Sequence, residues 1–135
     1  MIDPRFRLLR ATLTVNAISS GLFGASLLAG AVPLAPVLGA PGPLPVAVFG
    51  ALLLAFAFEV WRARREPVSL RQATFIFALD VAYVIASVVL LLAWPASLST
   101  IGRVVVALAA DMVAVFALLE YVGLRRARRM AVAEA

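Results

Sequence analysis

Two acidic residues, Asp80 and Asp111, lie near the middle of long apolar segments, where an ionisable side chain is chemically out of place. At a rise of 1.5 Å per residue, a helix would put Asp80 about 14 Å from Arg71 and Asp111 about 17 Å from Thr100. Ionisable groups within apolar spans are costly and are candidates for proton, ion or ligand binding. Because a charge in hydrocarbon is unfavourable, we expect at least one of the two to be protonated at neutral pH.

Other polar residues recur at helical spacing around these aspartates. They predict a polar midplane cluster made of Asn16, Asp80, Tyr83, Ser87, Arg103 and Asp111. Asp80, Tyr83 and Ser87 are three or four positions apart and so share one helix face. Three readings stay open: interhelical hydrogen bonds, a site for a ligand, proton or ion, and contact with another membrane protein. We expect Asp80 to face Asn16 or the Asp111 helix inside the protein rather than lipid.

The residue types that are missing exclude several kinds of chemistry. The chain has no Cys and no His, and all twelve of its basic residues are arginine. Disulfides, thiol and histidine catalysis, zinc fingers and Schiff bases on lysine are therefore excluded. No phosphate-binding, serine-hydrolase, zinc-protease or dinucleotide motif occurs, and two aspartates on different helices are a weak metal signal. We predict no catalytic centre, no cofactor and no metal.

The overall composition explains why apolar segments dominate the chain. Its 135 residues are 64% hydrophobic and 14% charged, and the mean hydropathy is +1.07. A soluble domain is nearer half apolar and a quarter charged, and one of this size could not bury so much apolar surface. A lipid bilayer is the solvent that this composition fits.

Four segments are long enough to cross a bilayer as helices. We predict an all-α, four-helix transmembrane bundle in a single domain, 1–135, with spans at about 8–31, 44–61, 72–94 and 100–122. Five prolines in the 32–45 linker forbid a continuous helix there, and its apolar residues predict packing against the bundle or at the membrane interface. Ser69 is a candidate cap for the third helix, and Ser97 or Ser99 for the fourth.

The arginines predict the orientation of the spans. Eleven of the twelve lie on one side of this arrangement, and Arg103 alone lies on the other. By the positive-inside rule, both termini and the 62–71 loop are cytoplasmic and the 32–45 loop is outside, as in a bacterial inner-membrane protein. This clustering at the ends of spans argues against nucleic-acid binding, despite the net charge of +5.

Residues at the membrane boundaries form a second predicted set. Tryptophan and arginine are typical of these boundaries, and the set comprises Trp61, Trp94, Arg125, Arg126, Arg128 and Arg129. The arginines in it are sufficiently explained as determinants of topology, with binding of anionic lipid head groups as the alternative. Glu59 and Glu120 are interpreted as interfacial charges compensated by Arg62 and Arg125.

Two further patterns bear on processing and assembly. The arginine-rich start and the Ala29-Gly30-Ala31 sequence are similar to a signal peptide, but the apolar stretch is longer than such a peptide has and contains Asn16. Small residues recur every four positions, as in Ala17, Gly21 and Ala25. This spacing allows helices to approach closely, either within the chain or between copies in a homo-oligomer.

The order of these features resembles small four-helix bacterial inner-membrane proteins of the DoxX-like type. The residues that carry the resemblance are Arg10, Asn16 and Ser19-Ser20-Gly21, then Leu79-Asp80 with Tyr83, and Ile101-Gly102-Arg103. The family's first-span glycines are matched in part, at Gly21 and Gly24. The resemblance implies a four-helix fold and an accessory role beside a membrane oxidoreductase, and it supplies no catalytic residues.

Two functions follow as predictions. The first is an accessory or scaffold subunit of a larger membrane complex, or a binder of a lipophilic small molecule, with no enzymatic activity. The alternative is a small oligomeric transporter or channel in which Asp80 or Asp111 handles a proton or cation.

Overall fold

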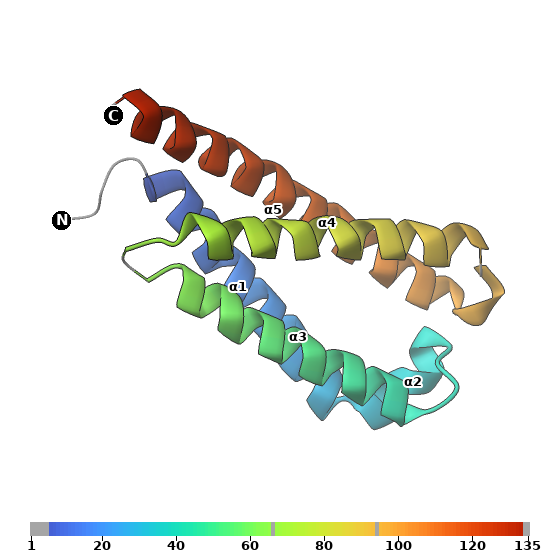
Figure 1. Cartoon of the computed structure of the whole chain (residues 1–135). Helices are drawn as coiled ribbons and strands as arrows, with labels where there is room; N and C mark the ends of the chain where they lie inside the picture. Colours follow the sequence, from blue (N-terminus) through green and yellow to red (C-terminus); the bar gives the residue numbers. More distant parts are fainter. Residues whose placement is uncertain (1–5, 66, 94, 134–135) are drawn as a thin grey trace.

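In the computed structural model, the chain is almost entirely helical across the residues that the structure describes, 6–65, 67–93 and 95–133 (Figure 1). The elements in chain order are α1 (Arg7–Ala29), α2 (Ala31–Leu38), α3 (Pro43–Ala63), α4 (Leu70–Ala93), the short 3-10 helix η2 (Pro95–Ser97) and α5 (Thr100–Ala133).

Four of these helices are long and apolar enough to cross a membrane: α1, α3, α4 and α5. The first three have 21 to 24 residues, which corresponds to about 32–36 Å and matches a hydrocarbon core of about 30 Å. The predicted helical fold class and its four apolar spans are confirmed. The fourth helix does not end with its predicted span near Val122 but continues to Ala133, because alanine, arginine and leucine sustain a helix.

The proline-rich linker is more ordered than its composition predicts. Its first part is the short helix α2, which contains Pro36 and ends at Gly39. Gly39 has a φ of 78°, a left-handed conformation that glycine adopts without steric cost. Pro43 then begins α3, where a missing amide hydrogen costs nothing. As predicted, no continuous helix runs through the linker. The short helix α2 within it was not predicted.

The linker also packs against the bundle, as expected from its apolar residues. The backbone amide of Ser99 donates to the Leu38 carbonyl oxygen over 3.1 Å, and the Ser99 hydroxyl donates to the carbonyl oxygen of Val37. The same hydroxyl accepts the amide of Gly102 at 2.9 Å, so Ser99 is the predicted cap of α5. Ser69 likewise caps α4, since its hydroxyl accepts the Gln72 amide at 3.3 Å.

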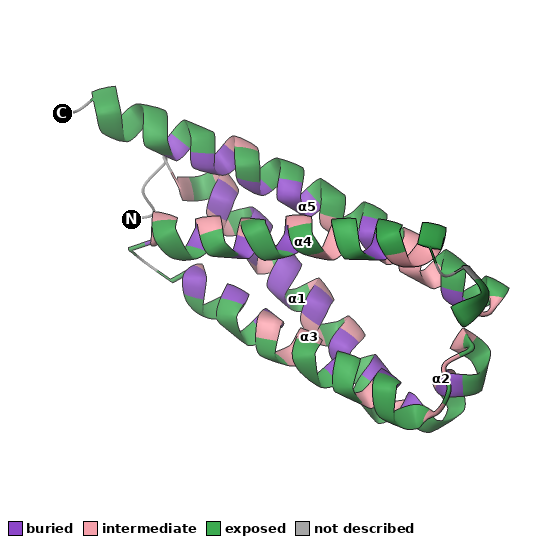
Figure 2. Cartoon of the chain, turned by 45° about the vertical axis from the view of Figure 1, so that its right-hand side comes forward, coloured by how far each residue is buried: buried purple, intermediate pink, exposed green. Residues whose placement is uncertain are grey.

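The four long helices are arranged as two pairs. α1 packs most extensively on α3, and α4 packs on α5, whereas α3 and α4 hardly contact each other. The pairs diverge from the end that holds both termini toward the end that holds α2 (Figures 1 and 2). Within the first pair, a β-carbon on Gly24 would lie 2.8 Å from the Gly50 carbonyl oxygen, so the two backbones are almost in contact.

Most of the buried apolar residues fall into two separate clusters. The larger one lies at the arginine-rich end and consists of Leu9, Leu13, Ala17, Val60, Ala63, Val68, Ala73, Ile76 and Leu124. The smaller one ties α2 to α1 and α3 and consists of Leu27, Ala31, Ala35 and Val46. The helix pairs are therefore joined firmly at one end, while α2 and Ser99 connect them at the other.

Candidate functional site

Asn16 is the centre of a buried polar triad. Its side-chain nitrogen Nδ2 donates to Asp80 Oδ2 at 2.7 Å and to Glu120 Oε1 at 3.1 Å. Its oxygen Oδ1 accepts the Ser20 hydroxyl at 3.0 Å. Asn16 and Glu120 are fully buried and Asp80 is 2% exposed. The prediction that Asp80 faces Asn16 inside the bundle is confirmed.

Three helices meet at this triad. α1 supplies Asn16 and Ser20, which lie one turn apart on a single face, α4 supplies Asp80 and α5 supplies Glu120. The larger apolar cluster surrounds the triad through Leu13 and Ile76, which are almost fully buried. Loss of any one of the three polar residues would therefore leave the others in an apolar environment.

One amide thus serves two carboxyl groups. Since both acceptor oxygens bond to the same nitrogen, they cannot be farther apart than the two hydrogen bonds together. Two ionised carboxylates at that distance in an apolar surrounding would repel each other strongly. The second oxygen of Glu120, Oε2, is buried and has no hydrogen-bond partner in the described structure. Chemically, the arrangement is suited to holding a proton or to donating and accepting hydrogen bonds.

The interpretation of Glu120 as an interfacial charge was wrong. The nearby Arg125 and the end of the apolar stretch favour that interpretation, but the helix continues to Ala133 and the Glu120 side chain is fully buried. The signal lay in its neighbours, since Ala117, Gly123 and Ala127 share the Glu120 face and are all buried. Gly123 lets α1 come close, with Leu9 atoms 3.1–3.3 Å from an added β-carbon. The predicted compensation of Glu59 by Arg62 is confirmed by their ion pair at 3.1 Å.

Two residues of the predicted cluster lie on the surface instead of inside the bundle. Asp111 and Arg103 are exposed on the surface of α5, and Arg103 donates to the Thr100 hydroxyl at 3.3 Å. Nine residues separate Asp111 from Glu120, which is two and a half helical turns. The two carboxyl groups therefore point to opposite sides of α5, and the bundle buries Glu120.

The exposed position of Asp111 leads to a testable prediction. At the centre of a span, aspartate costs about 2.5–3.5 kcal/mol on insertion scales, whereas leucine is favourable by about 0.5 kcal/mol. We expect Asp111→Leu to favour membrane insertion of α5 by about 3 kcal/mol, with no loss of folded stability. Insertion can be measured by glycosylation mapping of the full chain, with Met112→Leu as the exposed control. A folded protein weakened by Asp111→Leu would contradict this placement.

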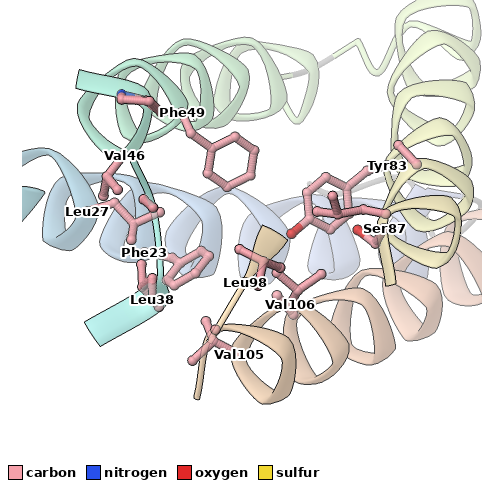
Figure 3. Close-up of a pocket in the computed structure, with 16 residues that line it drawn as sticks. Phe23, Leu27, Leu38, Val46, Phe49, Tyr83, Ser87, Leu98, Val105 and Val106 are labelled. Atoms are coloured by element: carbon pink, nitrogen blue, oxygen red, sulfur yellow. The ribbon is translucent and has the colours of Figure 1, made fainter. Parts of the chain in front are cut away.

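A cavity of about 380 Å³ lies between the two helix pairs. Tyr83 and Ser87 of α4 lie across it from Phe23 and Leu27 of α1 (Figure 3). The other residues that line it are almost all apolar. The predicted shared face of Tyr83 and Ser87 is thus directed into this cavity rather than into the triad.

A second cavity of about 250 Å³ adjoins the first and reaches Asp80 of the triad. Phe23, Phe49, Tyr83 and Ala109 line both cavities, and the rings of Phe49 and Tyr83 stack with centroids 6.2 Å apart. Asp80 and Ser20 lie on the wall of the second cavity. Asp80 therefore belongs both to the triad and to an apolar chamber.

The predicted boundary residues lie on the outside of the bundle where the structure describes them. Trp61 is exposed, and the guanidinium group of Arg64 lies 3.4 Å from its ring centroid, close enough for a cation–π interaction. Arg125, Arg126, Arg128 and Arg129 are exposed on the last turns of α5. Trp94, the other predicted boundary tryptophan, lies outside the described residues.

Comparison with protein-family models, with curated proteins and with solved structures finds no match to this chain.

Proposed function

We propose that this multi-pass membrane protein binds a lipophilic molecule in the chamber between its two helix pairs, without a catalytic centre of its own. The observation that carries the proposal is the pair of adjoining cavities, whose walls are apolar except for Asp80, Ser20, Tyr83 and Ser87. Small-molecule sites typically have such walls, with a few polar groups that orient the ligand, and volumes of about 300–1,000 Å³.

The position of the polar groups indicates what kind of molecule fits. They lie on the α1 and α4 walls, while the remaining surface is aliphatic or aromatic. A ligand with a long apolar body and a small polar head would satisfy both parts.

Filling the chamber tests this proposal. Ala109 lines both cavities, so we expect Ala109→Phe to occupy the space that the ligand needs. Binding of a pyrene-labelled fatty alcohol to the detergent-purified protein should weaken at least about tenfold, with an unchanged melting temperature. The matched control is Ala114→Phe, on the exposed side of α5. Equal binding by both variants would disprove the proposal.

A proton- or cation-coupled transporter is the second candidate, favoured by the two carboxyl groups on Asn16. The pair concerned is Asp80 and Glu120, in place of Asp80 and Asp111, because Asp80 links the triad to the chamber. Proteoliposomes separate the two candidates. A pure binding protein dissipates no pH gradient, whereas a transporter does so and loses this flux on Asp80→Asn.

For the orientation, we infer cytoplasmic termini in a bacterial inner membrane, on the strength of the eleven arginines on one side of the spans. Reporter fusions at Ala135 and within 36–42 test this inference, and a C-terminal reporter active only in the periplasm would overturn it. An accessory role beside a larger complex predicts co-purification of that complex in mild detergent. The DoxX-like resemblance supports this role.

A further inference from the structure

A third cavity, of about 380 Å³ and separate from the chamber, lies between α4 and α5 at the arginine-rich end of the bundle. Three arginines line it, Arg125, Arg128 and Arg129. They are spaced at i, i+3 and i+4, so they share one face of α5. The neighbouring Arg126 is not among the lining residues. The term arginine cleft is used below for this cavity.

The rest of the lining of the arginine cleft is largely apolar and aromatic. Phe77 of α4 and Tyr121 of α5 have ring centroids 6.1 Å apart, and Leu124 beside them is 5% exposed. Cationic and apolar groups thus line the same cavity. This combination of cationic and apolar groups matches an amphiphile with an anionic head and an apolar chain.

One of the three arginines is held in place by the opposite helix. Arg128 donates from its NH2 group to the Thr74 hydroxyl at 3.0 Å. That hydroxyl in turn donates to the Leu70 carbonyl oxygen at 2.7 Å. The guanidinium group is therefore fixed across the boundary between α4 and α5. An arginine needed solely to set topology would not require such a contact.

The positive charges of the cleft are not neutralised by carboxylates among its described lining residues. Its described lining residues carry three guanidinium groups and no carboxylate, so the like charges repel unless an anion joins them. We propose that the arginine cleft binds the phosphate group of an anionic phospholipid, with an acyl chain over Phe77 and Tyr121. Guanidinium groups suit this ligand because they bind phosphate oxygens in pairs.

Neutral substitutions test the cleft against the matched control Arg126→Gln. Binding of phosphatidylglycerol to the full chain in neutral detergent is measured by native mass spectrometry, with phosphatidylcholine as the zwitterionic comparison. We expect Arg128→Gln to weaken phosphatidylglycerol binding about fivefold and the triple glutamine variant at 125, 128 and 129 about a hundredfold. Arg126→Gln should stay within about twofold of the parent.

Further measurements distinguish a lipid phosphate from a soluble phosphate, and the arginine cleft from the chamber. Inorganic phosphate at millimolar concentration should not displace the lipid; displacement would assign the cleft to a soluble phosphate compound and overturn the lipid proposal. An equal loss on Arg126→Gln would mean diffuse charge attraction and would also overturn it. If the Arg128→Gln variant does not fold, Arg128→Lys replaces it in the binding measurement, because lysine keeps the positive charge. Ala109→Phe, which fills the chamber, should leave phosphatidylglycerol binding unchanged.

Discussion

Replacing Asn16 with leucine is expected to destabilise the folded bundle by about 2–4 kcal/mol, because two buried acceptors lose their donor at once. An ordinary interhelical hydrogen bond in a membrane protein contributes about 0.6 kcal/mol. The larger loss follows from the geometry, since Asn16 donates to both Asp80 and Glu120. Leucine has the same branching and the same number of side-chain heavy atoms as asparagine, so no cavity is left and loss of packing makes a small contribution.

Unfolding in mixed micelles with increasing SDS measures this change in free energy. Ser26→Ala is the control, because Ser26 is exposed on the same helix and its hydroxyl donates to the helix's own Leu22 carbonyl oxygen. The control should change stability by less than about 0.5 kcal/mol. A variant with leucine at all three triad positions should recover part of the loss, since an apolar core needs no donors. An Asn16→Leu protein as stable as Ser26→Ala would refute the central role of the triad.

Replacing Gly50 with alanine is expected to cost about 3 kcal/mol of folded stability, the upper end of the range for overpacking. The added β-carbon would lie 2.7 Å from the Gly24 carbonyl oxygen and 2.7 Å from the Leu28 amide nitrogen. Both atoms belong to the backbone of α1, so no side chain can move aside. The helix pair α1 and α3 has to separate instead.

A second helical glycine, Gly21, provides a control for which the expected change in folded stability has the opposite sign. At Gly21 an added β-carbon would lie 3.6 Å from the Ala57 β-carbon, which is ordinary van der Waals contact. Gly21→Ala is therefore expected to stabilise the protein by about 0.4–1 kcal/mol, because alanine loses less conformational entropy in a helix. The same unfolding assay serves for both glycines. Equal effects of the two substitutions would contradict the close α1–α3 approach.

Features that depend on composition and local spacing could be predicted from the sequence. Long apolar runs identified four spans, and serine at the start of an apolar run identified both helix caps. The contact between Asn16 and Asp80 was predictable too, because polar groups in a lipid environment seek each other. These inferences need no knowledge of how the helices rotate about their own axes.

The choice between Glu120 and Asp111 depends on that rotation. Both carboxyl groups lie on α5, and hydropathy alone favours the more central Asp111 as the buried one. Small residues around Glu120 decide otherwise, because they let α1 approach that face. The short helix α2 was missed for a related reason. Its eight residues include two prolines, and the helix packs on neighbouring helices. The composition of the linker alone does not show this packing.

The positions of the triad residues in the chain determine when the triad can form during synthesis. Asn16 precedes Asp80 by 64 residues and Glu120 by 104 residues. At about 5–20 residues per second, the ribosome adds the last of these partners roughly 5–20 s after Asn16. Until the end of that interval, the Asn16 amide lacks at least one of its two acceptors. The earliest span is thus completed by the latest one, and a nascent chain stopped before residue 120 has the four spans begun but the triad unfinished.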